Sequence, residues 1–182
     1  MNVLGLVALA IALAACGSSA TPKANPGTTA ASTKFQKAGA LPSITSKMVC
    51  AKEAQTEIGS NLGLTATRVT TPTWKDHVYT CTYVYPNGSF TLSVKEMSDT
   101  KSTTDYFDAY KTQFGVAQNL FGLGQGAFIG KNDDVVARKD YKVLLVDVKN
   151  LPKGLGKFVP ATTRSDAASN IAASIMACWS DA

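Results

Sequence analysis

The sequence contains one histidine, His77, and its four cysteines include no Cys-x-x-Cys pair. A zinc site needs several imidazole or thiolate ligands at close spacing, and a Ser/His/Asp triad would have to use that single histidine. His77 follows Lys75 and Asp76 in a polar stretch, so we interpret it as a solvated turn residue. We therefore predict no metal, no cofactor and no catalytic residue, and we expect that the protein is not an enzyme.

Charged residues are also scarce: they make up 17% of the chain, which has a net charge of +5. Three of the lysines, Lys23, Lys34 and Lys37, lie before residue 45, in a region that contains no acid. From residue 45 onward there are 15 basic and 13 acidic side chains. Binding to a nucleic-acid backbone needs a clustered stripe of Lys and Arg, which this mixture lacks. We expect no nucleic-acid partner.

The chain has no apolar run long enough to span a membrane. The apolar run at residues 3–15 would extend about 20 Å as a helix, whereas the hydrocarbon core of a bilayer is about 30 Å thick. Its length and its small final residues are typical of a signal peptide. Met1-Asn2 provides no Lys or Arg before this run, which leaves the true start position open but does not alter the prediction of export.

Residues 13–16, Leu-Ala-Ala-Cys, resemble the bacterial lipobox. The resemblance implies that a diacylglyceryl group is attached to the Cys16 sulfur and that the signal peptide, residues 1–15, is removed. Two acyl chains give stable membrane residence, whereas one gives only marginal binding. We therefore expect a protein held by lipid on the outer face of the cell membrane.

Residues 16–44 are rich in Ser, Thr, Ala, Pro and Gly. Such a segment buries too little apolar surface to offset its ordering entropy, so we interpret it as a tether. Residues 45–182 are expected to form one globular domain. Three helices are predicted in it. The first covers 47–61, the second starts with a capping box at Ser102 to Asp105 and ends at Gly115, and the third covers 164–179. Strands are predicted at 65–73, 78–85, 90–95, 127–130, 135–138 and 141–148.

This order of elements predicts an α+β fold, with an antiparallel sheet and three helices packed mainly on one face. The clearest local signal is Asn87-Gly88, since a type I′ hairpin turn needs φ > 0 at both central positions. Such a turn pairs Tyr85 with Phe90. The predicted core face of this hairpin consists of Tyr79, Cys81, Tyr83, Tyr85, Phe90, Leu92 and Val94.

Without Cys16, three cysteines remain: Cys50, Cys81 and Cys178. Cys81 lies on the predicted core face and Cys50 lies on the apolar side of the first helix, so a bond between them would join helix to sheet. A Cys81–Cys178 bond is the alternative. With the first pairing, Cys178 would be a buried free thiol, which behaves as a small apolar residue.

Two stretches that could suggest ligand loops are interpreted as turns. Gly122 to Gly126 follows a helix and leads into a strand, whereas a phosphate-binding loop follows a strand and opens a helix. Asp133-Asp134 lacks the Gly and the bidentate Glu of a calcium loop. The segment 149–164 is interpreted as a surface loop, with contact to membrane or glycan as the alternative.

Aromatic residues are concentrated in the hairpin and in the second helix. They could line an apolar pocket, although aromatic side chains at strand and helix spacing usually pack in an ordinary core. The candidate ligand contacts among them are Tyr83, Tyr85, Phe90 and Tyr110.

The lipobox, the tether, Cys50 near a helix start, the Cys81-Thr82-Tyr83 strand and the stretch from Gly122 to Phe128 together resemble the small actinobacterial lipoproteins of unknown function. The resemblance implies a Cys50–Cys81 disulfide and no catalytic residues. Cys178 and the uncharged Met1-Asn2 depart from that pattern.

We predict a non-enzymatic binding module of the cell envelope, with an envelope protein, a lipid or a glycan as its partner. One alternative is a lipid or glycolipid carrier with an aromatic-lined cavity. The other is an envelope hydrolase, which would need carboxylates that converge in a cleft. No pair of acids in the sequence has a spacing that indicates such a site.

Overall fold

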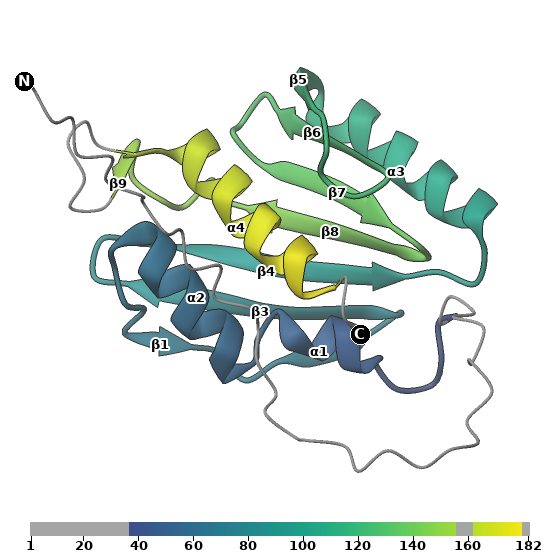
Figure 1. The fold of residues 1–182 in the computed structure, drawn as a ribbon, viewed down its shortest axis with the longest axis horizontal. Coiled ribbons are helices and arrows are strands. Elements are labelled where there is room, and N and C mark those ends of the chain that lie inside the picture. Colours follow the sequence, from purple (N-terminus) through teal and green to yellow (C-terminus); the bar gives the residue numbers. More distant parts are fainter. Residues whose placement is uncertain (1–36, 156–161, 180–182) are drawn as a thin grey trace, which may run out of the picture. The chain divides into compact units, whose positions relative to one another are not determined.

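The computed structural model of the protein describes residues 37–155 and 162–179. Eight strands form one antiparallel sheet in the order β1-β3-β4-β8-β7-β6-β5, and β2 also pairs with β3 (Figure 1). The strands are β1 (Arg68–Val69), β2 (Thr73–Lys75), β3 (Val78–Tyr85), β4 (Gly88–Glu96), β5 (Val116–Leu120), β6 (Gly126–Gly130), β7 (Val135–Lys139) and β8 (Lys142–Asp147). A separate two-stranded pair consists of β9 (Gly154–Leu155) and β10 (Thr162–Thr163).

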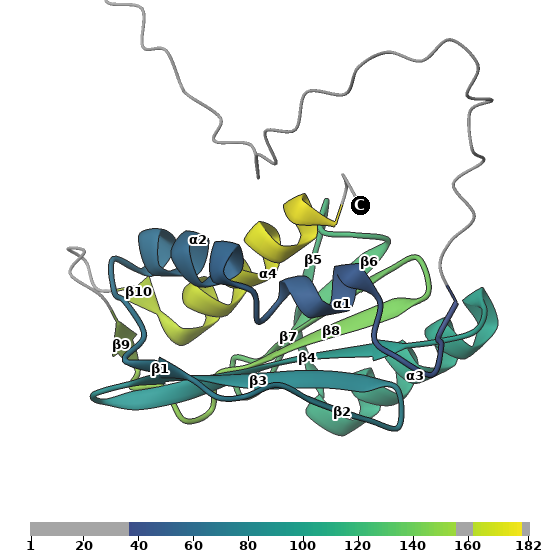
Figure 2. The same ribbon diagram turned by 90° about the horizontal axis from the view of Figure 1, so that it is seen from below.

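Helices cover the two faces of the sheet unequally. Helices α1 (Ile44–Met48), α2 (Lys52–Leu62) and α4 (Arg164–Cys178) lie on one face, and α3 (Thr100–Phe114) packs on the other against β6, β7 and β8 (Figure 2). The predicted fold class, an α+β domain with an antiparallel sheet and helices mainly on one face, is confirmed. Strand β8 lies between β4 and β7.

The first predicted helix is divided into α1 and α2. A continuous helix would use the carbonyl of Val49 to bind an amide four residues later. That carbonyl instead accepts a hydrogen bond of 2.7 Å from the Tyr83 hydroxyl. Helix α2 ends where Gly63 adopts φ 60°, a conformation that glycine takes without strain.

The N-cap of α3 differs from the prediction by three residues. Asp99, not Ser102, is the N-cap, and its carboxylate accepts a 2.8 Å hydrogen bond from the Ser102 amide. The capping box predicted from Ser102 to Asp105 is therefore wrong. A capping box does form in α4, between Thr163 and Asp166.

The β3–β4 hairpin keeps its predicted faces but not its predicted register. Tyr85 pairs with Gly88, and Tyr83 pairs with Phe90, two positions from the predicted partners. Pro86 explains the shift, because its fixed φ suits the first corner of a turn. Since side chains alternate along a strand with period two, a shift of two leaves each residue on its predicted face. Accordingly Cys81, Tyr83, Phe90, Leu92 and Val94 are all buried.

The core has two parts, one on each side of the sheet. The larger part lies under α1, α2 and α4 and includes Ile58, Leu92 and Ile171, each essentially inaccessible to solvent. The smaller part lies under α3 and is formed by Phe107, Phe128, Val136 and Val143. Within the described ranges, no helix is both long and apolar enough to cross a bilayer.

Candidate functional site

The predicted disulfide between Cys50 and Cys81 is present, with a Cα–Cα distance of 6.1 Å. It joins the turn between α1 and α2 to the middle of β3. The alternative Cys81–Cys178 pairing is therefore wrong. Cys178 is half-buried at the edge of the buried stripe of α4 and is not a free thiol, so the prediction of a buried free thiol there is also wrong. Cys16, the predicted site of lipidation, lies outside the described residues.

Three of the four predicted ligand contacts are buried together in the larger core. The rings of Tyr83 and Phe90 stack with centroids 4.7 Å apart, and Tyr85 stacks on Phe90 at 5.9 Å. Burial raises the pKa of Tyr85 to about 12 and raises the pKa of Tyr83 further. These side chains fill the space between the sheet and the helices above it.

The fourth predicted contact, Tyr110, lies on the other side of the sheet. It belongs to α3, where its hydroxyl is 2.7 Å from that of Tyr106 and its ring meets Phe114 edge-on at 5.1 Å. Burial, followed by the hydrogen bond with Tyr106, raises the pKa of Tyr110 above its ordinary value. The structure therefore divides the four predicted contacts between two clusters on opposite faces of the sheet.

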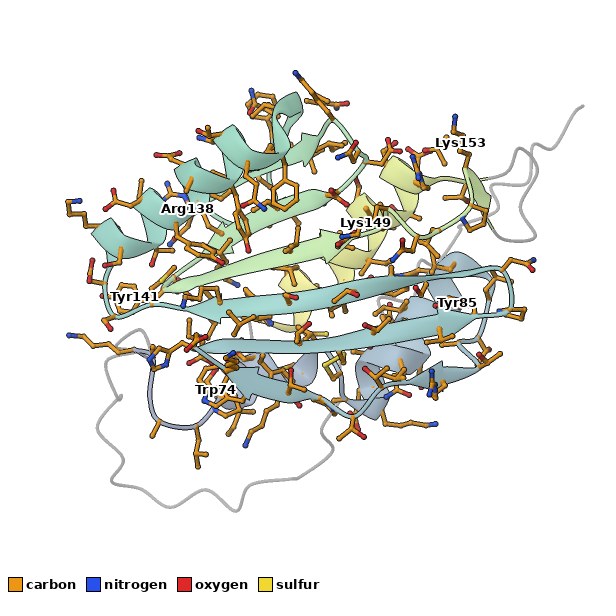
Figure 3. The ribbon with its side chains drawn as sticks, turned by 180° about the vertical axis from the view of Figure 1, so that it is seen from behind. Trp74, Tyr85, Arg138, Tyr141, Lys149 and Lys153 are labelled. Atoms are coloured by element: carbon orange, nitrogen blue, oxygen red, sulfur yellow. A yellow bond between two sulfur atoms is a disulfide. The ribbon has the colours of Figure 1, made fainter. Side chains whose placement is uncertain are left out.

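The second face of the β3–β4 hairpin has a different character. We call this surface the open face, because no helix of the described ranges lies in front of β3 and β4 in Figure 3. Its side chains are half-buried and mostly carry hydroxyl groups. They are Val78, Thr80, Thr82, Val84, Ser89, Thr91, Ser93 and Lys95.

Hydroxyl groups on the open face bind one another across the hairpin. The Oγ1 atoms of Thr82 and Thr91 are 3.0 Å apart, and Thr80 Oγ1 is 2.8 Å from Ser93 Oγ. Each hydroxyl has two acceptor lone pairs as well as its donor, so hydrogen-bonding capacity remains for a ligand.

Carboxyl groups extend this polar surface across β8 and toward β7. Asp147 of β8 pairs in register with Thr91. Asp134 immediately precedes β7, and continuing the register one position beyond the Val135–Val146 pair brings it opposite Asp147. We call Thr82, Thr91, Asp147 and Asp134 the polar row. It crosses β3, β4 and β8 on one face of the sheet and ends just before β7.

The two carboxyls of the polar row are in different environments. Asp134 is 2% exposed, and its Oδ1 accepts a 3.1 Å hydrogen bond from the Val148 amide. Burial raises the pKa of Asp134 to about 6, and the nearby charge of Asp147 adds to the shift. Asp147 is more accessible and forms a 2.8 Å ion pair with Lys149. Asp147 is therefore the more accessible carboxylate for a ligand, and Asp134 lies beside it, buried.

Sequence reasoning missed this carboxyl pair. The sequence predicts that Asp133-Asp134 lies in a polar hairpin turn, and the φ of 72° at Asp133 agrees with a turn there. Asp133 also forms a 2.9 Å ion pair with Arg164. The signal that would have revealed the pair is the β7–β8 register. Lys139 pairs with Lys142, and counting back along the two strands from this pair brings Asp134 opposite Asp147.

The predicted turns at His77 and at Gly122 to Gly126 are confirmed. His77 is exposed and occupies a two-residue turn with Asp76, both with φ > 0. Gly124 lies in a tight turn at φ 60°, where a Cβ atom would lie 2.4 Å from the Arg138 carbonyl oxygen. A depression of about 450 Å³ adjoins this turn and is lined by Leu123, Lys139 and Met176, among others.

The described residues include no group of three or more His, Cys, Asp or Glu side chains arranged to hold a metal ion. Comparison of the chain with protein-family models, with curated proteins and with solved structures finds no match. What can be said of its function therefore depends on its own residues.

Proposed function

We propose that this chain is an exported lipoprotein, anchored to the outer face of the cell membrane through Cys16, whose domain binds a polar ligand of the cell envelope. Support for export comes from the signal-like run, the lipobox and the disulfide between Cys50 and Cys81. Disulfides persist in oxidising compartments and are rare in the cytosol. The domain acts by binding and not by catalysis.

The observation that carries the binding proposal is the polar row. Antiparallel sheets often leave one face to solvent, and hydroxyl groups on such a face commonly pair across strands. Here the hydroxyls of Thr82 and Thr91 continue into the carboxylate of Asp147, which is 19% exposed. The row therefore presents fixed donors and acceptors along one line across the sheet.

A glycan is the ligand class that this chemistry fits best. Sugar hydroxyls both donate and accept hydrogen bonds, as do threonine hydroxyls, and a carboxylate accepts two of them at once. The tyrosine pair of α3, Tyr106 and Tyr110, adds amphipathic rings on the same side of the sheet. The lipid-carrier alternative lacks comparable support, because its four aromatic residues belong to two separate packed clusters.

The binding proposal is tested by titrating the mature chain with soluble peptidoglycan fragments and cell-wall oligosaccharides, followed by amide chemical shifts in NMR spectra. We expect shifts concentrated on β3, β4 and β8. In the variant Thr82→Val/Thr91→Val both hydroxyls are removed together, so neither is left without its partner and the shape is kept. We expect at least tenfold weaker binding.

Thr56→Val is the matched control, since Thr56 is an exposed threonine of α2, away from the open face. It should bind as tightly as the unmodified chain. Shifts that persist in the double variant, or an absence of shifts with every glycan tested, would contradict the proposed site.

The anchor is tested separately by the intact mass of the protein purified from its native membrane. A mature chain that begins at Cys16 and carries a diacylglyceryl group is the expected result. Cys16→Ser should abolish this mass increment and release the protein from the membrane fraction. An unmodified chain that begins elsewhere would overturn the proposed localisation.

A further inference from the structure

Large apolar side chains are exposed at few places in the described residues, and most of these places lie at one end of the sheet. Leu41 is 75% exposed, Ile44 is 76% exposed and Phe121 is 94% exposed. The fourth such residue, Val116, is only 40% exposed. Single exposed apolar residues need no explanation, so the point that matters is that these three share one end of the domain.

Hydrogen bonds show that these three residues share one end. Residues 38–44 are fastened there, because the Ala38 amide binds the Met97 carbonyl at 2.9 Å and the Ser43 amide binds the Glu96 carboxylate at 2.9 Å. The Met97 amide in turn binds the Tyr141 carbonyl at 2.7 Å, which places the β7–β8 turn beside them.

The loop that carries Phe121 meets the same turn. The Gln125 amide donates to the Arg138 carbonyl at 2.8 Å, and the Asp140 amide donates to the Gln125 side chain at 3.0 Å. Because Leu120 pairs with Ala127, the loop 121–125 extends past the ends of β5 and β6 at the β7–β8 turn. We call the surface formed by residues 38–44, the loop 121–125 and the β7–β8 turn the entry end.

Two amphipathic aromatic residues also lie at this end. Trp74 is half-buried and donates a 2.9 Å hydrogen bond from Nε1 to the Ala40 carbonyl. Figure 3 shows Trp74 and Tyr141 at one end of the sheet, and Tyr85, Lys149 and Lys153 toward the other. Trp and Tyr are the residues enriched where a protein meets the interface between lipid and water.

We infer that the entry end rests on the surface of the lipid bilayer, with Phe121, Leu41 and Ile44 inserted at the level of the headgroups. This inference rests on the proposed anchor at Cys16. Only 21 residues lie between Cys16 and Ala38. The domain is joined to this tether at the entry end itself, so this end is the one that the anchor holds nearest to the membrane.

The contact is apolar rather than electrostatic. Exposed Lys37 and Lys75 lie at this end, but Asp76 is exposed beside Lys75 and Asp140 lies beside Gln125. A covalent anchor keeps the domain at high local concentration near the bilayer, so a few apolar side chains are enough to orient it. The orientation leaves the open face, which runs along the strands, accessible to ligands from the side.

The test uses the lipidated chain reconstituted into vesicles of phosphatidylcholine and phosphatidylglycerol with brominated acyl chains, which quench tryptophan fluorescence on contact. Phe121→Trp introduces a probe at the entry end. Lys153→Trp is the matched control, because Lys153 is exposed at the opposite end. The fluorescence of the unmodified protein, which contains Trp74 and Trp179, is subtracted from both.

We expect the probe at position 121 to be quenched at least twice as strongly as the probe at position 153, and the quenching to persist in 0.5 M salt. Leu41→Asp/Ile44→Asp, two changes at solvent-exposed positions, should reduce the quenching at position 121. Some outcomes in protein that floats with the vesicles would overturn the inference and leave the anchor intact. These are equal quenching at the two positions and no quenching at either. Protein that does not float and lacks the lipid mass would overturn the anchor itself.

Discussion

The two faces of the β3–β4 hairpin are formed by the same 19 residues, 78–96, yet one is buried in the core and the other is partly exposed to solvent. One face carries Cys81, Tyr83, Phe90 and Leu92, which are buried under helices and fastened by a disulfide. The other carries hydroxyl groups that bind one another and no helix. The alternation of side chains along a strand is therefore enough to place a rigid support directly behind a polar surface. We therefore expect the stability of this domain and its proposed binding to depend on different side chains.

The largest effect is expected from removing the disulfide. Cys50→Ala/Cys81→Ala opens a loop of 31 residues, which costs about 3–4 kcal/mol of unfolding free energy in the chain-entropy model. Urea denaturation monitored by circular dichroism measures this difference. The unmodified protein in reducing agent should show a loss at least as large, because Cys178 is not a free thiol either. A loss below about 1 kcal/mol would mean that the packed face does not depend on this bond.

A neighbouring pair of residues gives the sharpest test of the two faces. Leu92→Ala creates a cavity in a fully buried position and should lower the unfolding free energy by about 3 kcal/mol. Thr91→Ala, the next residue along β4, removes a half-buried hydroxyl and should cost less than about 1 kcal/mol. Equal losses in urea denaturation would show that the open face also belongs to the core.

The sequence predicts the faces of the sheet well because burial follows alternation, which is local. The order of β3, β4, β6, β7 and β8 and the ends of α2 and α3 at Gly63 and Gly115 follow from short patterns in the same way. The edge strand β5 was missed, because its residues 116–120 are mostly exposed and show no apolar period.

The parts of the candidate site that could not be predicted depend on contacts between distant residues. The division of the first helix depends on the Tyr83 hydroxyl, 34 residues away from Val49. The polar row depends on the register of three strand pairs. For the first pair, β3–β4, the register predicted from Asn87-Gly88 is wrong by two residues. Tyr110 and Tyr83 are both aromatic, so the sequence alone groups them. Only the topology decides on which side of the sheet each one lies.

A smaller effect is expected at Asp134, and it depends on pH. The pKa of this carboxyl is about 6 in the folded protein and near 3.8 in the unfolded chain, so the folded state binds the proton more tightly. Its contribution to stability is present below about pH 4 and is lost as pH rises through 6. Asp134→Asn removes this titration and should raise stability at pH 7 by about 2 kcal/mol, with little change at pH 4.

The measurement for Asp134 is the pH dependence of thermal unfolding, with Asp133→Asn as the control. Asp133 lies one position earlier and is engaged in an ion pair with Arg164, so its replacement should lower stability slightly at pH 7. A stability profile of the Asp134→Asn variant that is parallel to that of the unmodified protein between pH 4 and 7 would contradict the assignment.

The smallest effect is expected at the border of the open face, where the tyrosine pair lies. Tyr106→Phe keeps the ring but removes the hydroxyl that is 2.7 Å from Tyr110, and should cost at most about 1 kcal/mol. Because that hydrogen bond helps to raise the pKa of Tyr110, the variant should lower this pKa, while burial still holds it above 10. Absorbance of tyrosinate during an alkaline titration measures the shift. If the pair belongs to the binding surface, a bound glycan will raise the pKa of Tyr110 in the unmodified protein and less so in the variant; equal changes would confine the site to the polar row.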